Sequence, residues 1–107
     1  LVNISDLLLD KRLLPDDYKV FQNYPNPFNP ITNIQYQLPK EYYVNINIYN
    51  LKGKKIRGLL NKKQPGGYYS IIWDAKNDFG KHVSAGVYLY EVKISDYRQI
   101  KKMILLK

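Results

Sequence analysis

The chain has 107 residues and 45% hydrophobic content, which suits one small domain with its own core and argues against intrinsic disorder. It has no cysteine and one histidine, which excludes a disulfide scaffold and argues against a thiolate or histidine metal site and a Ser-His-Asp triad. Its net charge of +8 comes from residues 40–107, which hold fourteen basic and five acidic side chains. The electrostatic field of such a segment favours a polyanion as partner, or the lysines simply form a solvated surface.

Residues 1–17 differ in composition from the rest of the chain. Ser5 could cap a short helix that Pro15 would end, or the segment is a linker or the tail of a preceding domain. The first nine residues lack the basic region and cleavage site of a signal peptide, and no apolar run approaches the ~20 residues of a membrane-spanning helix. Because the chain starts at Leu1 rather than methionine, we expect it to be a fragment, the C-terminal end of a longer protein.

A proline-rich stretch at residues 23–30, N-Y-P-N-P-F-N-P, precedes the first clear strand. Proline fixes φ and biases the residue before it toward extended geometry, so this stretch is stiff but cannot join a central strand. We predict a crossover from one sheet to the other, in which Phe28 plugs the end of the core. Asn26 and Asn29 are expected to close turns through their own side chains.

Period-two alternation from Tyr18 onward predicts strands at residues 19–22, 32–38, 44–49, 54–60, 68–73, 87–95 and 99–106. In the sixth strand the inward face is ambiguous, and we assign Tyr88, Tyr90 and Val92 to it because the other face would bury Glu91 and Lys93. The remaining inward positions are Ile34, Tyr36, Leu38, Val44, Ile46, Ile48, Ile56, Tyr69, Ile71 and Trp73. Short strands at this spacing predict an all-β, Ig-like or fibronectin-III-like antiparallel sandwich of about seven strands.

The loop D-A-K-N-D-F-G, Asp74 to Gly80, is the one acidic cluster that invites a calcium site. Its spacing does not fit an EF-hand, because Lys76 and Phe79 stand where a ligand and a glycine are needed. We therefore predict that Asp74, Asn77 and Asp78 form an ordinary turn, with no metal and no cofactor.

No residue set predicts catalysis. His82 and the serines match no nucleophile motif, and a catalytic pair cannot be assigned among nine scattered acids. Two tyrosine pairs, at residues 42–43 and 68–69, could offer an aromatic platform to sugars or bases. Since neighbours on a strand point to opposite faces, one member of each pair is more simply part of the core.

The motifs N-Y-P-N-P-F-N-P, T-x-I-x-Y-x-L-P, I-Y-N-x-x-G, W-D-x-x-N-x-x-G, G-V-Y-x-Y and K-K-M-x-L occur in this order from Asn23 to Leu105. Together they resemble the type A C-terminal sorting domain of the type IX (Por) secretion system, and the related Ig-like domain of flagellar hook-capping proteins. Ala75 stands where the pattern has glycine, and Ala85 is an extra residue before Gly86. The motif residues are Asn23, Tyr24, Pro25, Asn26, Pro27, Phe28, Asn29, Pro30, Trp73, Asp74, Asn77 and Gly80.

The resemblance covers residues 18–107 and implies a sorting domain there, which leaves residues 1–17 as a linker or the tail of a preceding domain. Such a domain is a non-enzymatic address that an outer-membrane translocon recognises from the periplasm, after which the domain is removed or the cargo is attached to the surface. Partners would be that translocon and its processing machinery, with weak polyanion or lipopolysaccharide contact and no nucleic acid. The alternative is an Ig-like spacer or adhesive, carbohydrate-binding module that is retained. The resemblance assigns the signal to Gly86, Val87, Tyr88, Tyr90, Lys101, Lys102, Met103 and Leu105.

Overall fold

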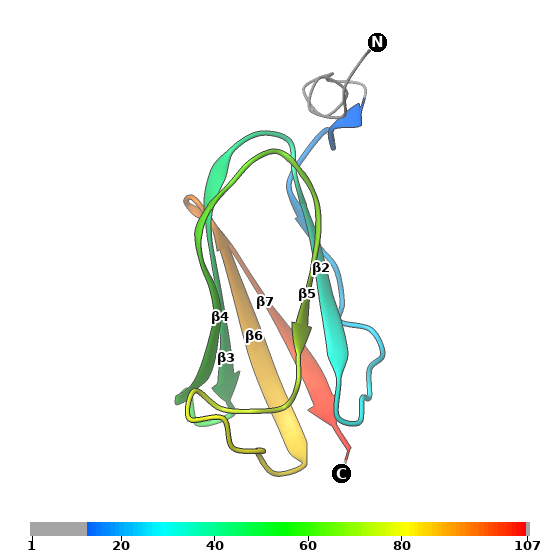
Figure 1. Ribbon diagram of the computed structural model, residues 1–107, viewed down its shortest axis with the longest axis vertical. Coiled ribbons are helices and arrows are strands. Elements are labelled where there is room, and N and C mark those ends of the chain that lie inside the picture. Colours follow the sequence, from blue (N-terminus) through cyan, green and yellow to red (C-terminus); the bar gives the residue numbers. More distant parts are fainter. Residues whose placement is uncertain (1–12, 107) are drawn as a thin grey trace.

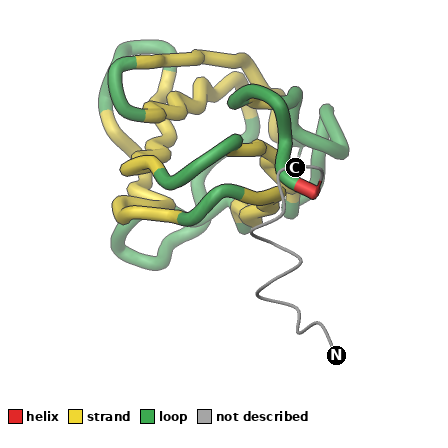
Figure 2. Tube along the Cα trace, turned by 90° about the horizontal axis from the view of Figure 1, so that it is seen from above, coloured by secondary structure: helices red, strands yellow, loops and turns green. Residues whose placement is uncertain are grey.

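The computed structural model describes residues 13–106 and forms two antiparallel sheets packed face to face (Figure 1). The three-stranded sheet has the order β1-β2-β5, where β1 is Lys19–Val20, β2 is Thr32–Leu38 and β5 is Gly67–Trp73. The four-stranded sheet has the order β4-β3-β6-β7, built from β3 (Tyr42–Asn50), β4 (Lys55–Gln64), β6 (Gly86–Ile94) and β7 (Tyr97–Leu105). Figure 2 views the molecule from above, with strands on opposite sides of the core. The predicted all-β sandwich of seven strands is confirmed.

The described residues include no helix long and apolar enough to cross a membrane. The helix or linker predicted for the amino-terminal residues falls mostly on residues 1–12, which lie outside the described part of the chain. Tyr18 already belongs to the sandwich, because its ring packs on Tyr42 and Tyr97 at centroid distances of 5.8 and 4.5 Å.

Alternation along the strands produces the core as predicted. The inward side chains of β2, β3 and β6 are buried, and Trp73 at the end of β5 is wholly enclosed. Ile56, Tyr69 and Ile71 are only partly buried and pack on the edge of this core. Each large apolar side chain buried in this way stabilises the fold by ~1.5–3 kcal/mol. The largest fully enclosed apolar side chains are Trp73, Tyr90, Phe28, Ile34, Leu38, Ile46, Ile48, Ile94, Met103, Val44 and Val92.

The fourth strand is longer than predicted. The alternation predicts a strand that ends at residue 60, but β4 continues to Gln64, opposite Tyr42 of β3. Since β4 is an edge strand, Lys62 and Lys63 stay in water while the backbone pairs on one side only. The buried amide oxygen of Gln64 accepts a hydrogen bond from the Tyr36 hydroxyl, which fixes the strand end.

Glu91 is buried, although the inward face of β6 was assigned so that this carboxylate would stay exposed. The inward set is right, but Glu91 on the outer face is only 7% exposed. The Tyr49 hydroxyl donates to its carboxylate at 3.4 Å, and Arg98 lies 3.4 Å from its other oxygen. The long side chains of the neighbouring strands therefore cover this carboxylate while keeping it paired.

The proline-rich stretch is not a crossover between sheets, and that prediction is wrong. It joins β1 to β2 within the three-stranded sheet, and a backbone bridge between Tyr24 and Asn33 closes the return. The reason is that β1 itself pairs with β2, so the stretch returns the chain to the sheet that it left. Phe28 is buried against Trp73 at a centroid distance of 5.7 Å, so its predicted place at the end of the core is confirmed.

Candidate functional site

The predicted signal residues lie on one hairpin, formed by β6 and β7. Its register pairs Gly86 with Leu105, Tyr88 with Met103 and Tyr90 with Lys101. Tyr88, Tyr90, Met103 and Leu105 are buried; Gly86, Val87 and Lys101 are half-buried; and Lys102 is exposed. The buried members shape the hairpin from within, so it presents to solvent its backbone edge, Lys102 and the partly exposed neighbours.

Tyr90 connects this hairpin to the proline-rich stretch. Its hydroxyl accepts a hydrogen bond from the Asn23 N–H at 2.9 Å and donates one to the Phe21 carbonyl at 2.8 Å. Burial raises the pKa of Tyr90 to about 12, although the hydrogen bond from Asn23 acts in the opposite direction. The Asn23 side chain continues inward to the Thr32 hydroxyl at 2.9 Å, so the stretch begins from a buried polar anchor.

The proline-rich stretch covers the last residues of β7. In an antiparallel pair, every second residue directs its N–H and C=O away from the partner, and for β7 these are the even-numbered residues. The Ile104 N–H donates to the Asn26 side chain at 2.9 Å, and the Ile104 carbonyl accepts from the Phe28 N–H at 2.9 Å. The Leu106 N–H then donates to the Phe28 carbonyl at 2.8 Å. Asn26 therefore reaches across to the other sheet, and its predicted turn through its own side chain is wrong.

Nearer the hairpin turn, the same edge is open. The Gln22 side chain still reaches the Lys102 carbonyl at 2.7 Å. Beyond it, no hydrogen bond among residues 13–106 reaches the outward backbone groups of Arg98 and Ile100. Both side chains are also exposed, and the uncovered edge of the C-terminal strand runs from Arg98 to Ile100.

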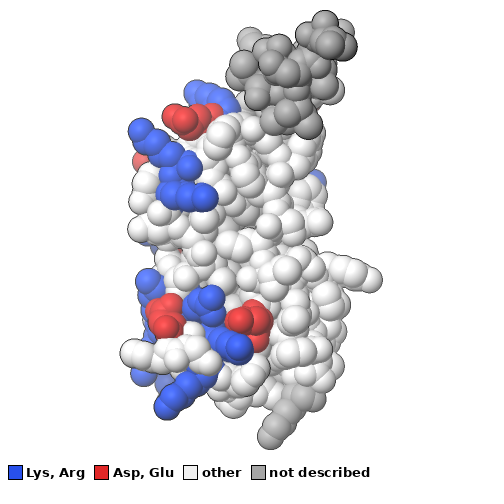
Figure 3. All heavy atoms as spheres, viewed as in Figure 1, with Lys and Arg blue, Asp and Glu red and all other residues white. Residues whose placement is uncertain are grey.

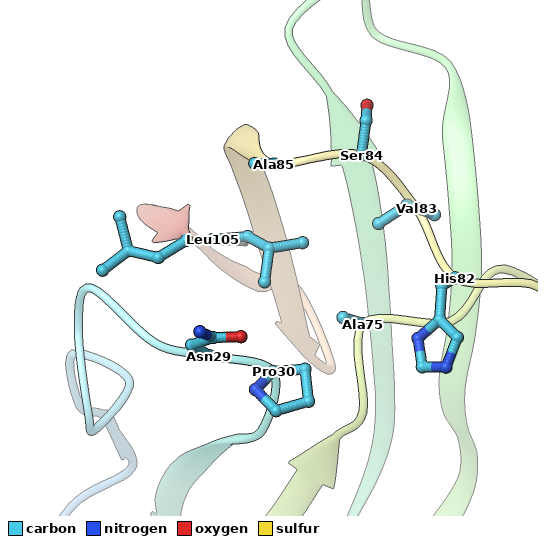
Figure 4. A pocket seen from close by; sticks show the side chains of 9 residues that line it. Asn29, Pro30, Ala75, His82, Val83, Ser84, Ala85 and Leu105 are labelled. Carbon is cyan, nitrogen blue, oxygen red and sulfur yellow. The ribbon is translucent and has the colours of Figure 1, made fainter.

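A cleft of about 500 Å³ opens at the end of the sandwich, between the proline-rich stretch, the loop after β5 and the end of β7. His82 and Ser84 both line it, but their side chains point away from each other (Figure 4). Within the described residues, no three His, Cys, Asp or Glu side chains gather as metal ligands. The cleft holds no arrangement of a nucleophile and its base.

The acidic loop is built largely as predicted. The Asn77 side chain accepts from the backbone N–H groups of Phe79 at 2.9 Å and Lys81 at 3.1 Å, which makes it the turn former. The Asp74 carboxylate accepts from the Lys76 N–H at 3.2 Å and pairs with Arg57 at 3.3 Å.

Asp78 differs, because its carboxylate leaves the turn and accepts from the Gly58 N–H of β4 at 2.9 Å. Ala75 adopts φ 61°, the left-handed conformation that explains why the family pattern has glycine there. The absence of an obligatory metal stays a prediction.

The tyrosine pairs do not form a platform. Tyr43 and Tyr68 are exposed, but they belong to strands of different sheets, while Tyr42 and Tyr69 pack on the core. The ring of Tyr69 stacks on Tyr36 at a centroid distance of 5.2 Å. One member of each pair is thus part of the core, as expected from strand alternation.

Comparisons with solved structures show the same fold in larger proteins. Dimeric latent PorU from Porphyromonas gingivalis is 24% identical with a TM-score of 0.68, over 86% of this chain and 9% of PorU. PorZ, an essential bacterial surface component of the type-IX secretion system of the same bacterium, is 20% identical with a TM-score of 0.58, over 82% of this chain and 11% of PorZ. The chain thus corresponds to about a tenth of either protein, and these identities show the fold alone.

A more remote likeness is to the DNA glycosylase AlkC of Pseudomonas fluorescens, at 14% identity and a TM-score of 0.51, over 85% of this chain and 31% of that chain. No curated protein matches the sequence. The sequence profile of the FlgD Ig-like domain matches residues 30–97, which is more than half of the chain. The chain belongs to the FlgD Ig-like domain family.

Proposed function

We propose that this domain is a C-terminal sorting signal that directs a secreted protein across the outer membrane through the type IX secretion system, without catalysis of its own. The observation that carries the proposal is the joining of two distant motifs into one surface. Asn26 and Phe28 of the proline-rich motif are hydrogen-bonded to Ile104 and Leu106 at the end of β7. The likeness to a region of PorZ, a surface component of that system, supports the same reading.

The open part of the edge, from Arg98 to Ile100, suits recognition by strand addition. A receptor strand would pair with the outward backbone groups and read the alternating side chains. The proline-rich stretch restricts this pairing, because it already occupies the backbone groups of Ile104. The signal would therefore be read from the hairpin turn toward Lys102, with the covered part fixing the register.

A secretion assay tests the proposal. A reporter carrying a signal peptide and followed by residues 1–107 should reach the surface of a host that has the type IX system, and deletion of residues 101–107 should leave it in the periplasm. Because that deletion also removes buried Met103 and Leu105, the decisive variant is Lys101→Gln with Lys102→Gln. Its expected result is impaired export with unchanged circular dichroism.

The matched control makes the same charge change on the other edge of the same sheet, as Lys62→Gln with Lys63→Gln. Both of these lysines are exposed on β4, so the net charge matches that of the test variant, and circular dichroism checks the fold of both variants. Export of the control should be normal. Unimpaired export of the reporter that lacks residues 101–107 would refute the sorting function and favour an Ig-like spacer or adhesive module that remains on the cell-surface protein.

A further inference from the structure

Two turns of the same design stand at one end of the sandwich. Residues 50–54 read N-L-K-G-K and residues 77–81 read N-D-F-G-K. In each, the Asn side chain accepts from the backbone N–H groups two and four residues later, at 2.9 and 3.0 Å in the first turn and 2.9 and 3.1 Å in the second.

The backbone hydrogen bonds of the two turns also coincide. The Asn N–H donates to the carbonyl of the fifth residue at 3.0 Å in the first turn and 2.9 Å in the second, and the glycine N–H donates to the Asn carbonyl at 3.0 Å in both. Gly53 and Gly80 have φ of 83° and 78°, the left-handed conformation that glycine adopts without strain. These hydrogen bonds hold the backbone of each turn, so each turn presents its side chains from a fixed position.

The two turns lie next to each other, because the second turn docks on the strand that the first one opens. The Asp78 N–H donates to the Ile56 carbonyl at 3.0 Å, and the Asp78 carboxylate accepts from the Gly58 N–H at 2.9 Å. Arg57 adds a hydrogen bond to the Lys76 carbonyl at 3.2 Å. Figure 1 shows both turns at the lower end of the molecule, away from the described amino-terminal residues at the top.

Each turn exposes one large apolar side chain. Leu51 is 66% exposed and Phe79 is 87% exposed. The turn geometry depends on asparagine and glycine, so a polar residue would serve the fold equally well at these two positions. Single exposed apolar side chains are ordinary, but two held on adjoining turns form a pair of apolar tips.

Cationic side chains predominate in the two segments that carry these tips. Residues 50–57 and 74–81, which we name the basic turn pair, carry six cationic and two anionic side chains. Asp74 pairs with Arg57 and Asp78 bonds to β4, and the six cationic and two anionic side chains leave a net charge of +4. Figure 3 shows Lys and Arg at this lower corner of the molecule, with acidic side chains between them. The cationic residues are Lys52, Lys54, Lys55, Arg57, Lys76 and Lys81.

We propose that the basic turn pair docks this domain on a bilayer that contains anionic lipid, with Leu51 and Phe79 inserted at the boundary between head groups and acyl chains. Lysines alone would serve any polyanion, but protruding apolar tips gain free energy only when they enter an apolar phase. Anionic head groups match the net positive charge of the two segments. The inference does not rest on the sorting function, because vesicle binding needs no secretion machinery.

The test uses the whole chain with vesicles of phosphatidylcholine, with and without phosphatidylglycerol. Phe79→Trp supplies a probe, since the natural tryptophan, Trp73, is fully buried and insensitive to lipid. We expect binding only to the anionic vesicles, with a blue shift of the emission of the new tryptophan. Absence of binding, or binding without a blue shift, would overturn the proposal.

Substitutions separate insertion from simple charge attraction. Leu51→Ser with Phe79→Ser should lower the partition coefficient by roughly a hundredfold, at about tenfold for each apolar side chain. The matched control, Tyr68→Ser with Ile72→Ser, changes two exposed apolar side chains on β5 and should bind normally. Lys52→Gln with Lys54→Gln should weaken binding about fivefold per lysine, whereas Lys62→Gln with Lys63→Gln on the far part of β4 should have little effect. If the serine variant binds as tightly as the natural chain and soluble heparin competes, the surface is a polyanion site and the bilayer proposal is wrong.

Discussion

Tyr90→Phe tests whether the hydrogen bonds of the buried Tyr90 hydroxyl hold the proline-rich stretch against the C-terminal strand. Tyr90 is fully buried, and its hydroxyl holds the Asn23 N–H at 2.9 Å and the Phe21 carbonyl at 2.8 Å. Phenylalanine keeps the ring and its packing but removes both hydrogen bonds. The change therefore isolates the polar link between the two motifs.

The expected loss follows from what is left unpaired. A buried polar group without a partner costs ~1–3 kcal/mol, and Asn23 is buried while Phe21 is partly exposed and can bind water. We expect about 2 kcal/mol lower free energy of unfolding for Tyr90→Phe. Tyr88→Phe is the control, because its hydroxyl donates to the carbonyl of exposed Ser84, which water can satisfy, so its loss should stay below about 1 kcal/mol.

Urea denaturation measures the loss, and amide hydrogen exchange locates it. The Ile104 and Leu106 amides bond to the proline-rich stretch, so they exchange when that stretch lifts from β7. In Tyr90→Phe these amides should lose more protection than the interior of β3 does, and in Tyr88→Phe they should not. A Tyr90→Phe variant with natural stability and unchanged protection at both amides would refute the reasoning.

Two further predictions concern stability. Trp73→Ala should lower the free energy of unfolding by ~3–5 kcal/mol in urea denaturation, because the ring is fully enclosed between Phe28 and Tyr88. Ile72 is exposed on the same strand, so Ile72→Ala should cost under about 0.5 kcal/mol. Equal losses would contradict the assigned faces. Burial raises the pKa of both Tyr36 and Tyr90 from 10.0 to about 12, so their contribution is complete below about pH 10 and is lost as pH rises through 12. At about pH 11 each of these tyrosines should therefore account for roughly 1.4 kcal/mol of destabilisation. Tyr90→Phe should lose less stability between about pH 8 and 11 than the natural chain. An identical loss in the two proteins would contradict the raised pKa of Tyr90.

The sequence by itself determined the strands and the faces that they bury. Alternation is a local property, so Val44, Ile46 and Ile48 could be assigned to the core without knowledge of their partners. Asn50 and Asn77, each followed three residues later by glycine, also contain the signal for their turns, because one side chain and one left-handed residue close them locally.

Only the tertiary structure decided what the proline-rich stretch and the edges do. The path of that stretch depends on which strands pair, and its hydrogen bonds to Ile104 and Leu106 join residues some 78 positions apart, beyond any local pattern. The burial of Glu91 likewise depends on Tyr49 and Arg98 from the flanking strands. The basic turn pair arises in the same way, since two similar turns become one surface only when Asp78 docks on β4.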